Sequence, residues 1–299
     1  MKSLLITLKG TRICIGLATT ALLLCTSLYT FPQREPQNIY RVRVQSRYVL
    51  EDGKRTSTFY AVNQQIQDSL GRLHTEIDYD WVTQYPNNYR WHYFDGLTKT
   101  KTEHFVNERL SRVEEFGRDS EGRITELRIF NASPADTILQ VRVIYQLNPD
   151  GTIARATGFN SQGKRGFRAT YTHDAKGTEI ERRVRGKRVA PPDSIMRLSR
   201  VPLYDSLGRM VEEKVTTHRV NGEERFEHYT YTYDDKGNLV SRVSLDRLGN
   251  VMERRVYTYR HDNRVQLLER FDGSGNLLEF TAWRYEIYRT SDRRHRTFE

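Results

Sequence analysis

A six-residue motif recurs along this chain: aspartate, two variable residues, glycine, arginine or asparagine, and an apolar residue. Aspartate can hydrogen-bond to its own backbone two residues on, and glycine accepts the positive φ that closes a type I turn with a bulge. The motif therefore predicts a hairpin turn followed by the first residues of the next strand. The six turns are marked by Asp68 and Gly71, Asp119 and Gly122, Asp205 and Gly208, Asp234 and Gly237, Asp246 and Gly249, and Asp272 and Gly275.

Between the turns, apolar and polar residues alternate. In 73–81, for example, Leu73, Ile77 and Tyr79 alternate with acidic residues and a histidine. This period of two is typical of antiparallel strands with one half-buried face. The turn spacing leaves strands of roughly 8 to 11 residues. We therefore predict an all-β antiparallel meander of roughly fourteen to eighteen strands, forming an elongated, wrapped or open barrel-like sheet.

The same pattern makes two local predictions. Each turn glycine should have a positive φ. The apolar residue that ends each motif should point to one buried side of the sheet, while the arginine or asparagine before it faces water. These apolar residues are Leu73, Ile124, Met210, Leu239, Val251 and Leu277.

The first 31 residues differ from the rest. Lys2, Lys9 and Arg12 precede an uncharged stretch, residues 13–31, that we expect to be an apolar helix. This order of features is typical of an export signal. A run of that length is also just long enough to cross a bilayer, so a cleaved signal and a membrane anchor both remain open. Cys25 after three leucines resembles a lipoprotein signal, although Leu24 is larger than that signal prefers.

Both cysteines, Cys14 and Cys25, lie in this first segment, so the predicted exported body has no thiol for a disulfide. We assign 1–31 to a signal peptide or anchor, 39–290 to a β-meander domain and 291–299 to a basic tail. A Pro-containing loop at 185–195 is either a subdomain boundary or a long hairpin loop within one continuous sheet.

The segment Tyr231-Thr-Tyr-Asp-Asp-Lys-Gly-Asn-Leu239 resembles the tyrosine–aspartate (YD) repeat of Rhs proteins, whose core is Tyr-x-Tyr-Asp-x-x-Gly-Arg/Asn-Leu. Partial copies occur around Tyr171, Leu203 and Tyr257. Rhs proteins form long β shells around a C-terminal toxin, and no toxin domain follows here. The chain is also similar to short exported β-repeat proteins of Bacteroidetes-type envelopes. Neither resemblance implies a catalytic residue or a cofactor.

Aromatic residues are concentrated around the predicted turn at Pro86, in excess of what one buried face requires. Rows of aromatic rings on a sheet stack against sugar rings or against each other. We therefore expect that any ligand surface lies in this segment. Its residues are Tyr79, Trp81, Tyr85, Tyr89, Trp91 and Tyr93.

No local motif indicates catalysis or metal binding. The turn aspartates lack the second carboxylate that a calcium loop needs, and no two of the eight histidines have the spacing of metal ligands on a strand. We expect a protein that is not an enzyme and that holds no cofactor or metal.

The formal net charge is +10, and the densest basic stretch is 181–188, followed by 293–296. An exported chain does not normally meet nucleic acid, so anionic envelope polymers or lipid headgroups are the better partners for a basic surface. We interpret 181–188 as a solvated hairpin tip. The sequence thus favours an exported scaffold or binding module of the periplasm, cell surface or membrane, with glycans, anionic polymers or another envelope protein as partners. A trimmed Rhs-type shell component and, less favoured, a carbohydrate-active enzyme are the alternatives.

Overall fold

The computed structural model describes residues 6–8, 11–13, 39–80, 82–132, 136–186 and 191–289. In this part of the chain every regular element is a strand, and no helix is long and apolar enough to cross a membrane. The expected helix at 13–31 and the basic tail lie outside the described residues. The strands are β1 (Ile6–Leu8), β2 (Thr11–Ile13), β3 (Ile39–Glu51), β4 (Lys54–Gln67), β5 (Leu73–Tyr79), β6 (Pro86–Asp95), β7 (Thr98–Val106), β8 (Arg109–Arg118), β9 (Ile124–Ala132), β10 (Thr137–Leu147), β11 (Ile153–Asn160), β12 (Arg165–His173), β13 (Glu179–Arg185), β14 (Ile195–Tyr204), β15 (Met210–Arg219), β16 (Glu224–Tyr233), β17 (Leu239–Leu245), β18 (Val251–Tyr259), β19 (Val265–Asp272) and β20 (Leu277–Arg289).

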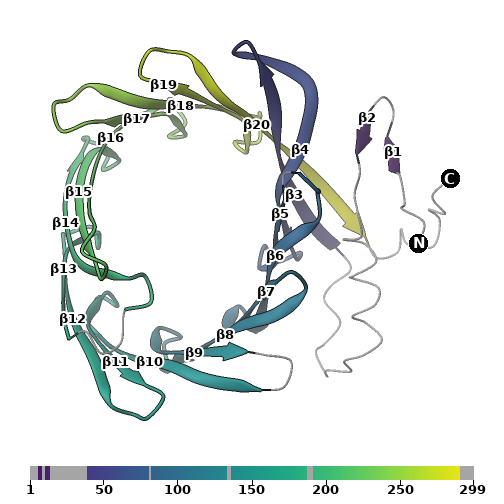
Figure 1. Ribbon diagram of the computed structural model, residues 1–299. Helices are drawn as coiled ribbons and strands as arrows, with labels where there is room; N and C mark the ends of the chain where they lie inside the picture. Colours follow the sequence, from purple (N-terminus) through teal and green to yellow (C-terminus); the bar gives the residue numbers. More distant parts are fainter. Residues whose placement is uncertain are drawn as a thin grey trace.

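Strands β3 to β20 form one closed barrel of 18 antiparallel strands (Figure 1), while β1 and β2 form a separate two-stranded sheet. Each barrel strand pairs with its neighbours in the sequence. The ring is closed by β20 and β3, which pair from Phe280 opposite Tyr48 to Arg289 opposite Ile39. The predicted all-β meander is confirmed, and closure leaves the barrel without the free edges of an open sheet.

The six motifs form the turns that the sequence predicts. All six glycines have φ between 78° and 89°. At the first turn, Asp68 Oδ1 accepts hydrogen bonds from the N–H groups of Leu70 and Arg72, both at 2.9 Å. Asp68 Oδ2 accepts from Arg72 Nε at 2.6 Å. Because the protein's own donors engage both carboxylate oxygens, the aspartate stabilises the turn without a metal.

The prediction for the last motif residue was wrong in detail. Five of these six side chains are half-buried, but Val251 is 46% exposed. The preceding arginines do not simply face water either, since Arg72 and Arg209 turn back onto the aspartates of their own turns. In these turns the ion pair with aspartate replaces part of the hydration of the arginine. The alternation of the strand therefore does not by itself determine where the arginine side chain lies.

Tyrosines link each hairpin to the preceding one along one rim of the barrel. The hydroxyl of Tyr233 donates to Met210 O at 2.7 Å, that of Tyr259 to Leu239 O at 2.8 Å, and that of Tyr285 to Val265 O at 2.9 Å. Arg209 also lies over the Tyr233 ring, with 4.9 Å between Cζ and the ring centroid. Tyr233 and Arg209 therefore join two adjacent hairpins, and Arg209 also stabilises its own turn.

A small apolar cluster lies on the lumen side of β10, β11 and β12. Val143, Ala156, Phe167 and Ala169 are each at most 2% exposed. Gly158 leaves room for the Phe167 ring, because a Cβ at residue 158 would lie 1.9 Å from that ring. Residues 191–194, which belong to the loop before β14, also contact the lumen face. Pro191 is buried, and Asp193 forms an ion pair with Arg182. Strands β13 and β14, which this loop joins, pair directly within the one sheet.

Candidate functional site

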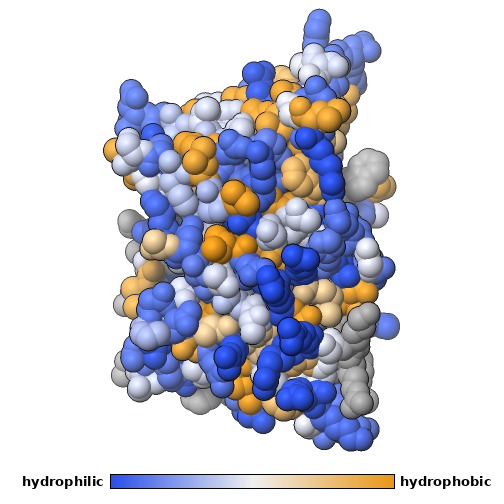
Figure 2. Space-filling model, turned by 90° about the vertical axis from the view of Figure 1, so that its left-hand side faces the viewer, coloured by the Kyte–Doolittle hydropathy of each residue, from blue (hydrophilic) through white to orange (hydrophobic). Residues whose placement is uncertain are grey.

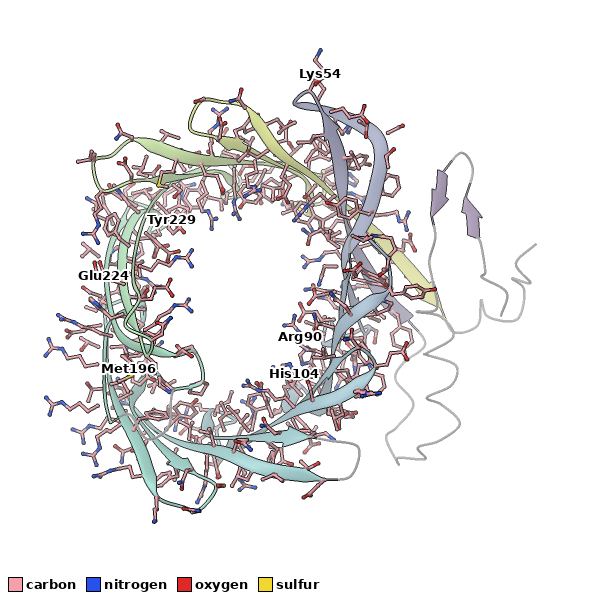
Figure 3. All side chains as sticks on the ribbon, in the orientation of Figure 1. Lys54, Arg90, His104, Met196, Glu224 and Tyr229 are labelled. Carbon is pink, nitrogen blue, oxygen red and sulfur yellow. The ribbon has the colours of Figure 1, made fainter. Side chains whose placement is uncertain are left out.

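The two faces of the barrel wall carry different chemistry. Arg90 and His104 point into the lumen (Figure 3), and residues two apart along each strand share their face. With every described side chain drawn, the middle of the ring stays open (Figure 3). The outer wall over β12 to β16 is largely hydrophilic (Figure 2). A candidate site must therefore be sought separately on the lumen face and on the outer face.

The lumen face carries many charges, but they form pairs. Arg90 lies 3.3 Å from Glu76 and 3.2 Å from Asp78. On the opposite wall, Arg200 pairs with Glu213 at 3.1 Å. The same holds for Arg112 with Glu114, Arg255 with Glu253, and Arg270 with Glu253 and Glu279. These pairs offset the named charges, while His92 Nε2 and His104 Nε2 are buried and accept or donate no hydrogen bond within the described residues.

His92 lies on the lumen face, with a side chain that is only 9% exposed. Burial, helped by the nearby positive charge of Lys99, lowers the pKa of His92 to about 4. Its Nδ1 lies 3.0 Å from Thr102 Oγ1. His92 is therefore neutral at pH 7 and shares a hydrogen bond within the wall. Within the described ranges, no three His, Cys, Asp or Glu side chains gather as metal ligands would.

The predicted ligand surface lies on the outer face of β5, β6 and β7. Tyr89, Trp91 and Tyr93 alternate along β6, and Tyr79 ends β5 on the same face, because Ile77 pairs with Tyr89. Phe105 of β7 pairs with Tyr89. We call Tyr79, Tyr89, Trp91, Tyr93 and Phe105 the outer aromatic surface.

Three of these rings pack into a stack. Tyr89 and Phe105 are parallel to within 11°, with centroids 4.6 Å apart. Trp91 lies 4.8 Å from Phe105 and 5.8 Å from Tyr89. Tyr85 is 56% exposed in the loop between β5 and β6, apart from this stack, and Trp81 lies outside the described residues. The sequence did not point to Phe105, because only the β6–β7 register brings it beside Tyr89.

Polar groups border the rings. The Tyr79 hydroxyl donates to Gln64 Oε1 and the Tyr93 hydroxyl to Glu103 Oε2, both at 2.6 Å. Lys101 Nζ lies 2.8 Å from Glu103 Oε1 and 4.2 Å from the centre of the Tyr93 ring. Burial raises the pKa of Tyr79 to about 12, so this phenol stays protonated at neutral pH.

A groove of about 540 Å³ adjoins this surface at Tyr93. Strand β8 contributes Gly117 to it, where a Cβ would lie 3.0 Å from the Cβ of Glu126. A cavity of this size suits a small ligand or one or two sugar units. The groove is lined by Tyr93, Thr100, Lys101, Glu115, Phe116, Gly117 and Arg128.

Comparisons with known proteins find only distant structural similarity. No family model and no curated protein matches the chain. A porin-like protein from Bacteroides uniformis is 12% identical, with a TM-score of 0.38, covering 85% of this chain and 99% of that one. A porin-like protein from Bacteroides vulgatus is 11% identical, with a TM-score of 0.37 and coverage of 81% and 97%. The TcdB2–TccC3 structure is 9% identical, with a TM-score of 0.17, covering 79% of this chain and 18% of that one. The proposals below therefore depend on this chain's own residues.

Proposed function

We propose that this chain is an exported, non-catalytic binding protein of a bacterial cell envelope, and that its outer aromatic surface holds a carbohydrate. The stack of Tyr89, Trp91 and Phe105 is the observation that carries the proposal. Aromatic rings offer flat apolar faces to the C–H groups of sugars, and polar groups at their edges bond sugar hydroxyls. Lys101 and Glu103 supply such groups beside Tyr93.

The groove favours binding over hydrolysis. Glycosidases need two carboxyl groups facing each other across the scissile bond. Of the described residues that line the groove, Glu115 alone is acidic. We therefore favour a binding module over a carbohydrate-active enzyme.

The outer wall favours a barrel that faces water. Arg142, Arg168 and Arg197 lie on the outer face of their strands and are exposed. An arginine that faces lipid near the middle of a bilayer costs about 2–4 kcal/mol. Several such residues on neighbouring strands would oppose insertion of this wall into a membrane, so we place the barrel in the periplasm or at the cell surface.

Binding can be tested on the full-length protein with an array of neutral and acidic glycans, followed by titration calorimetry. Trp91→Ala should weaken binding of any glycan found by about tenfold or more, because a central aromatic anchor carries much of the binding energy. Phe226→Ala is the matched control, since it removes a half-buried aromatic ring from β16, away from the surface. Equal affinity of Trp91→Ala and the wild type would contradict the proposed surface.

Export is tested separately. Residues 1–40 fused to a reporter that works only outside the cytoplasm should give an active reporter, because three cations precede the uncharged run. An inactive, stably produced fusion would remove the envelope assignment and leave the binding proposal intact.

The open lumen favours a second candidate, a trimmed Rhs-type shell component in toxin delivery. Such a shell would enclose another polypeptide. Native mass spectrometry of the protein purified from its own cells should then show a bound peptide or protein, which the carbohydrate-binding proposal does not require.

A further inference from the structure

Five arginines gather on the outer face of four neighbouring strands, on a part of the wall that does not include the outer aromatic surface. They form two directly opposed cross-strand pairs, because Arg168 pairs with Arg185 and Arg183 with Arg197 in the strand register. All five are exposed. We call them the outer arginine cluster: Arg155 of β11, Arg168 of β12, Arg183 and Arg185 of β13, and Arg197 of β14.

This arrangement corrects the interpretation of 181–188 as a hairpin tip. Residues 181–185 belong to strand β13, and alternation directs Arg183 and Arg185 outward while Arg182 faces the lumen. Residues 187–190 lie outside the described part. Residues 181–185 of the basic stretch are therefore part of the wall, where their charges are held in fixed register with those of β12 and β14.

The cluster has few counter-charges. Arg183 has a carboxylate partner, Glu181 at 2.6 Å. Among the described residues, no carboxylate pairs with Arg155, Arg168, Arg185 or Arg197. The lumen arginines Arg90, Arg200 and Arg255 each have a carboxylate within 3.3 Å.

Like charges directly opposite each other on a sheet destabilise it. The cluster contains two such pairs and only one carboxylate partner. An anion bound from outside would therefore reduce the repulsion and stabilise this part of the wall. The guanidinium groups are planar donors that match carboxylates. Thr157 lies opposite Arg168 and Thr170 opposite Arg183 and Arg155, so hydroxyls separate the charges.

We infer that the outer arginine cluster binds an acidic polysaccharide, a linear polymer with carboxylates at regular intervals, laid across strands β11 to β14. Neighbouring strands lie about 4.8 Å apart, so the two arginines of each opposed pair can meet neighbouring charged groups of such a chain. The wall is convex (Figure 1), and a flexible polymer can follow it, whereas a flat bilayer would meet only a narrow strip. The threonine hydroxyls suit a polymer that is itself rich in hydroxyls.

The test uses full-length protein and polygalacturonate, with dextran as the uncharged polymer. Arg168→Gln with Arg185→Gln removes both arginines of one opposed pair and should weaken binding by about tenfold or more, because hydrogen bonds to charged groups are the strong ones. The matched control is Arg247→Gln with Arg254→Gln. It removes the same charge from exposed arginines of the β17–β18 hairpin that already contact Glu224 and Phe271.

The control should bind within about twofold of the wild type, since its charges lie far from the cluster and are screened. Equal losses in the two double variants would show general charge attraction and overturn the site. Tighter binding to anionic vesicles, polyphosphate or DNA than to polygalacturonate, lost in the cluster variant, would overturn the choice of polymer. Binding to dextran as strong as to polygalacturonate would overturn it as well.

A thermal melt gives a second readout that does not need a measured affinity. Arg185→Gln should melt at a higher temperature than the wild type without polymer, because it removes a like-charge pair. Polygalacturonate should raise the melting temperature of the wild type and raise that of the cluster variant less. A lower melting temperature of Arg185→Gln would show that Arg185 is satisfied within the wall and would overturn the inference.

Discussion

Three tyrosine hydroxyls that join adjacent hairpins allow a quantitative test of how the barrel is held together. Tyr233, Tyr259 and Tyr285 each donate one hydrogen bond, of 2.7 to 2.9 Å, to a backbone carbonyl on the preceding strand. Replacing each by phenylalanine keeps the ring and removes that bond, and at Tyr285 it also removes a hydrogen bond with Arg43. A typical intramolecular hydrogen bond contributes about 1 kcal/mol to the free energy of unfolding.

The three sites lie on β16, β18 and β20 and share no partner. Alternate strands are about 9.6 Å apart, a separation at which effects of mutations usually add. The triple variant should therefore lose about 3 kcal/mol. For a domain of this size, 1 kcal/mol shifts Tm by about 2–4 °C, so the triple variant should melt about 6–12 °C lower than the wild type.

The assay is thermal unfolding followed by circular dichroism, with chemical denaturation to confirm the free energy. Tyr85→Phe is the control, because Tyr85 is 56% exposed in a loop, and its Tm should not move by more than about 1 °C. A triple variant that melts with the Tyr85→Phe control would refute the role of these hydroxyls. If the triple variant lost no more stability than one single Tyr→Phe variant, the three hydrogen bonds would not contribute independently.

Three further predictions concern the turns, the buried carboxylate and the apolar cluster. Gly237→Ala should destabilise by about 1 kcal/mol or more in denaturant titrations, because alanine is strained at the φ of 83° found there; an unchanged midpoint would count against it. Burial raises the pKa of the Asp68 carboxyl, but its hydrogen bonds from Arg72 outweigh this and hold the pKa below its usual value. Asp68 therefore adds stability that is complete above about pH 4 and is lost as the pH falls through the lowered pKa, so Asp68→Asn should flatten the acid limb of the stability curve; an identical acid limb in the variant would exclude this role. Gly158→Ala should lower Tm strongly, since the new Cβ would lie 1.9 Å from Phe167, and Phe167→Leu in the same chain should restore part of the loss; a normal Tm of the single variant would show that the Phe167 ring is free to move.

Local chemistry explains why the turns and strands were predictable. The Asp and Gly of each motif satisfy the turn within a few residues, so the sequence alone determines its form. Alternation then placed Tyr79, Tyr89, Trp91 and Tyr93 on one face without knowledge of the partner strands. These features depend on neighbours in the chain, which a single sequence shows directly.

Closure and cross-strand partners were not predictable in the same way. The pairing of β20 with β3 joins residues more than two hundred positions apart, and no motif marks it. Phe105 joined the outer aromatic surface through the β6–β7 register, which a one-residue slip would have reversed. The distinction between lumen and outer face also arises only once the ring is closed.

Closure also decides where binding chemistry can reside. Inside the ring, side chains from facing and adjacent strands crowd together, so an arginine such as Arg90 finds both Glu76 and Asp78 within 3.3 Å. Outside the ring, the wall is convex and side chains diverge, so Arg168 and Arg185 meet each other and no carboxylate among the described residues. On the same outer face the Tyr89, Trp91 and Phe105 rings pack against one another. The arginines that lack a carboxylate partner among the described residues therefore include four on the outer wall, and we expect an anionic ligand of this barrel there.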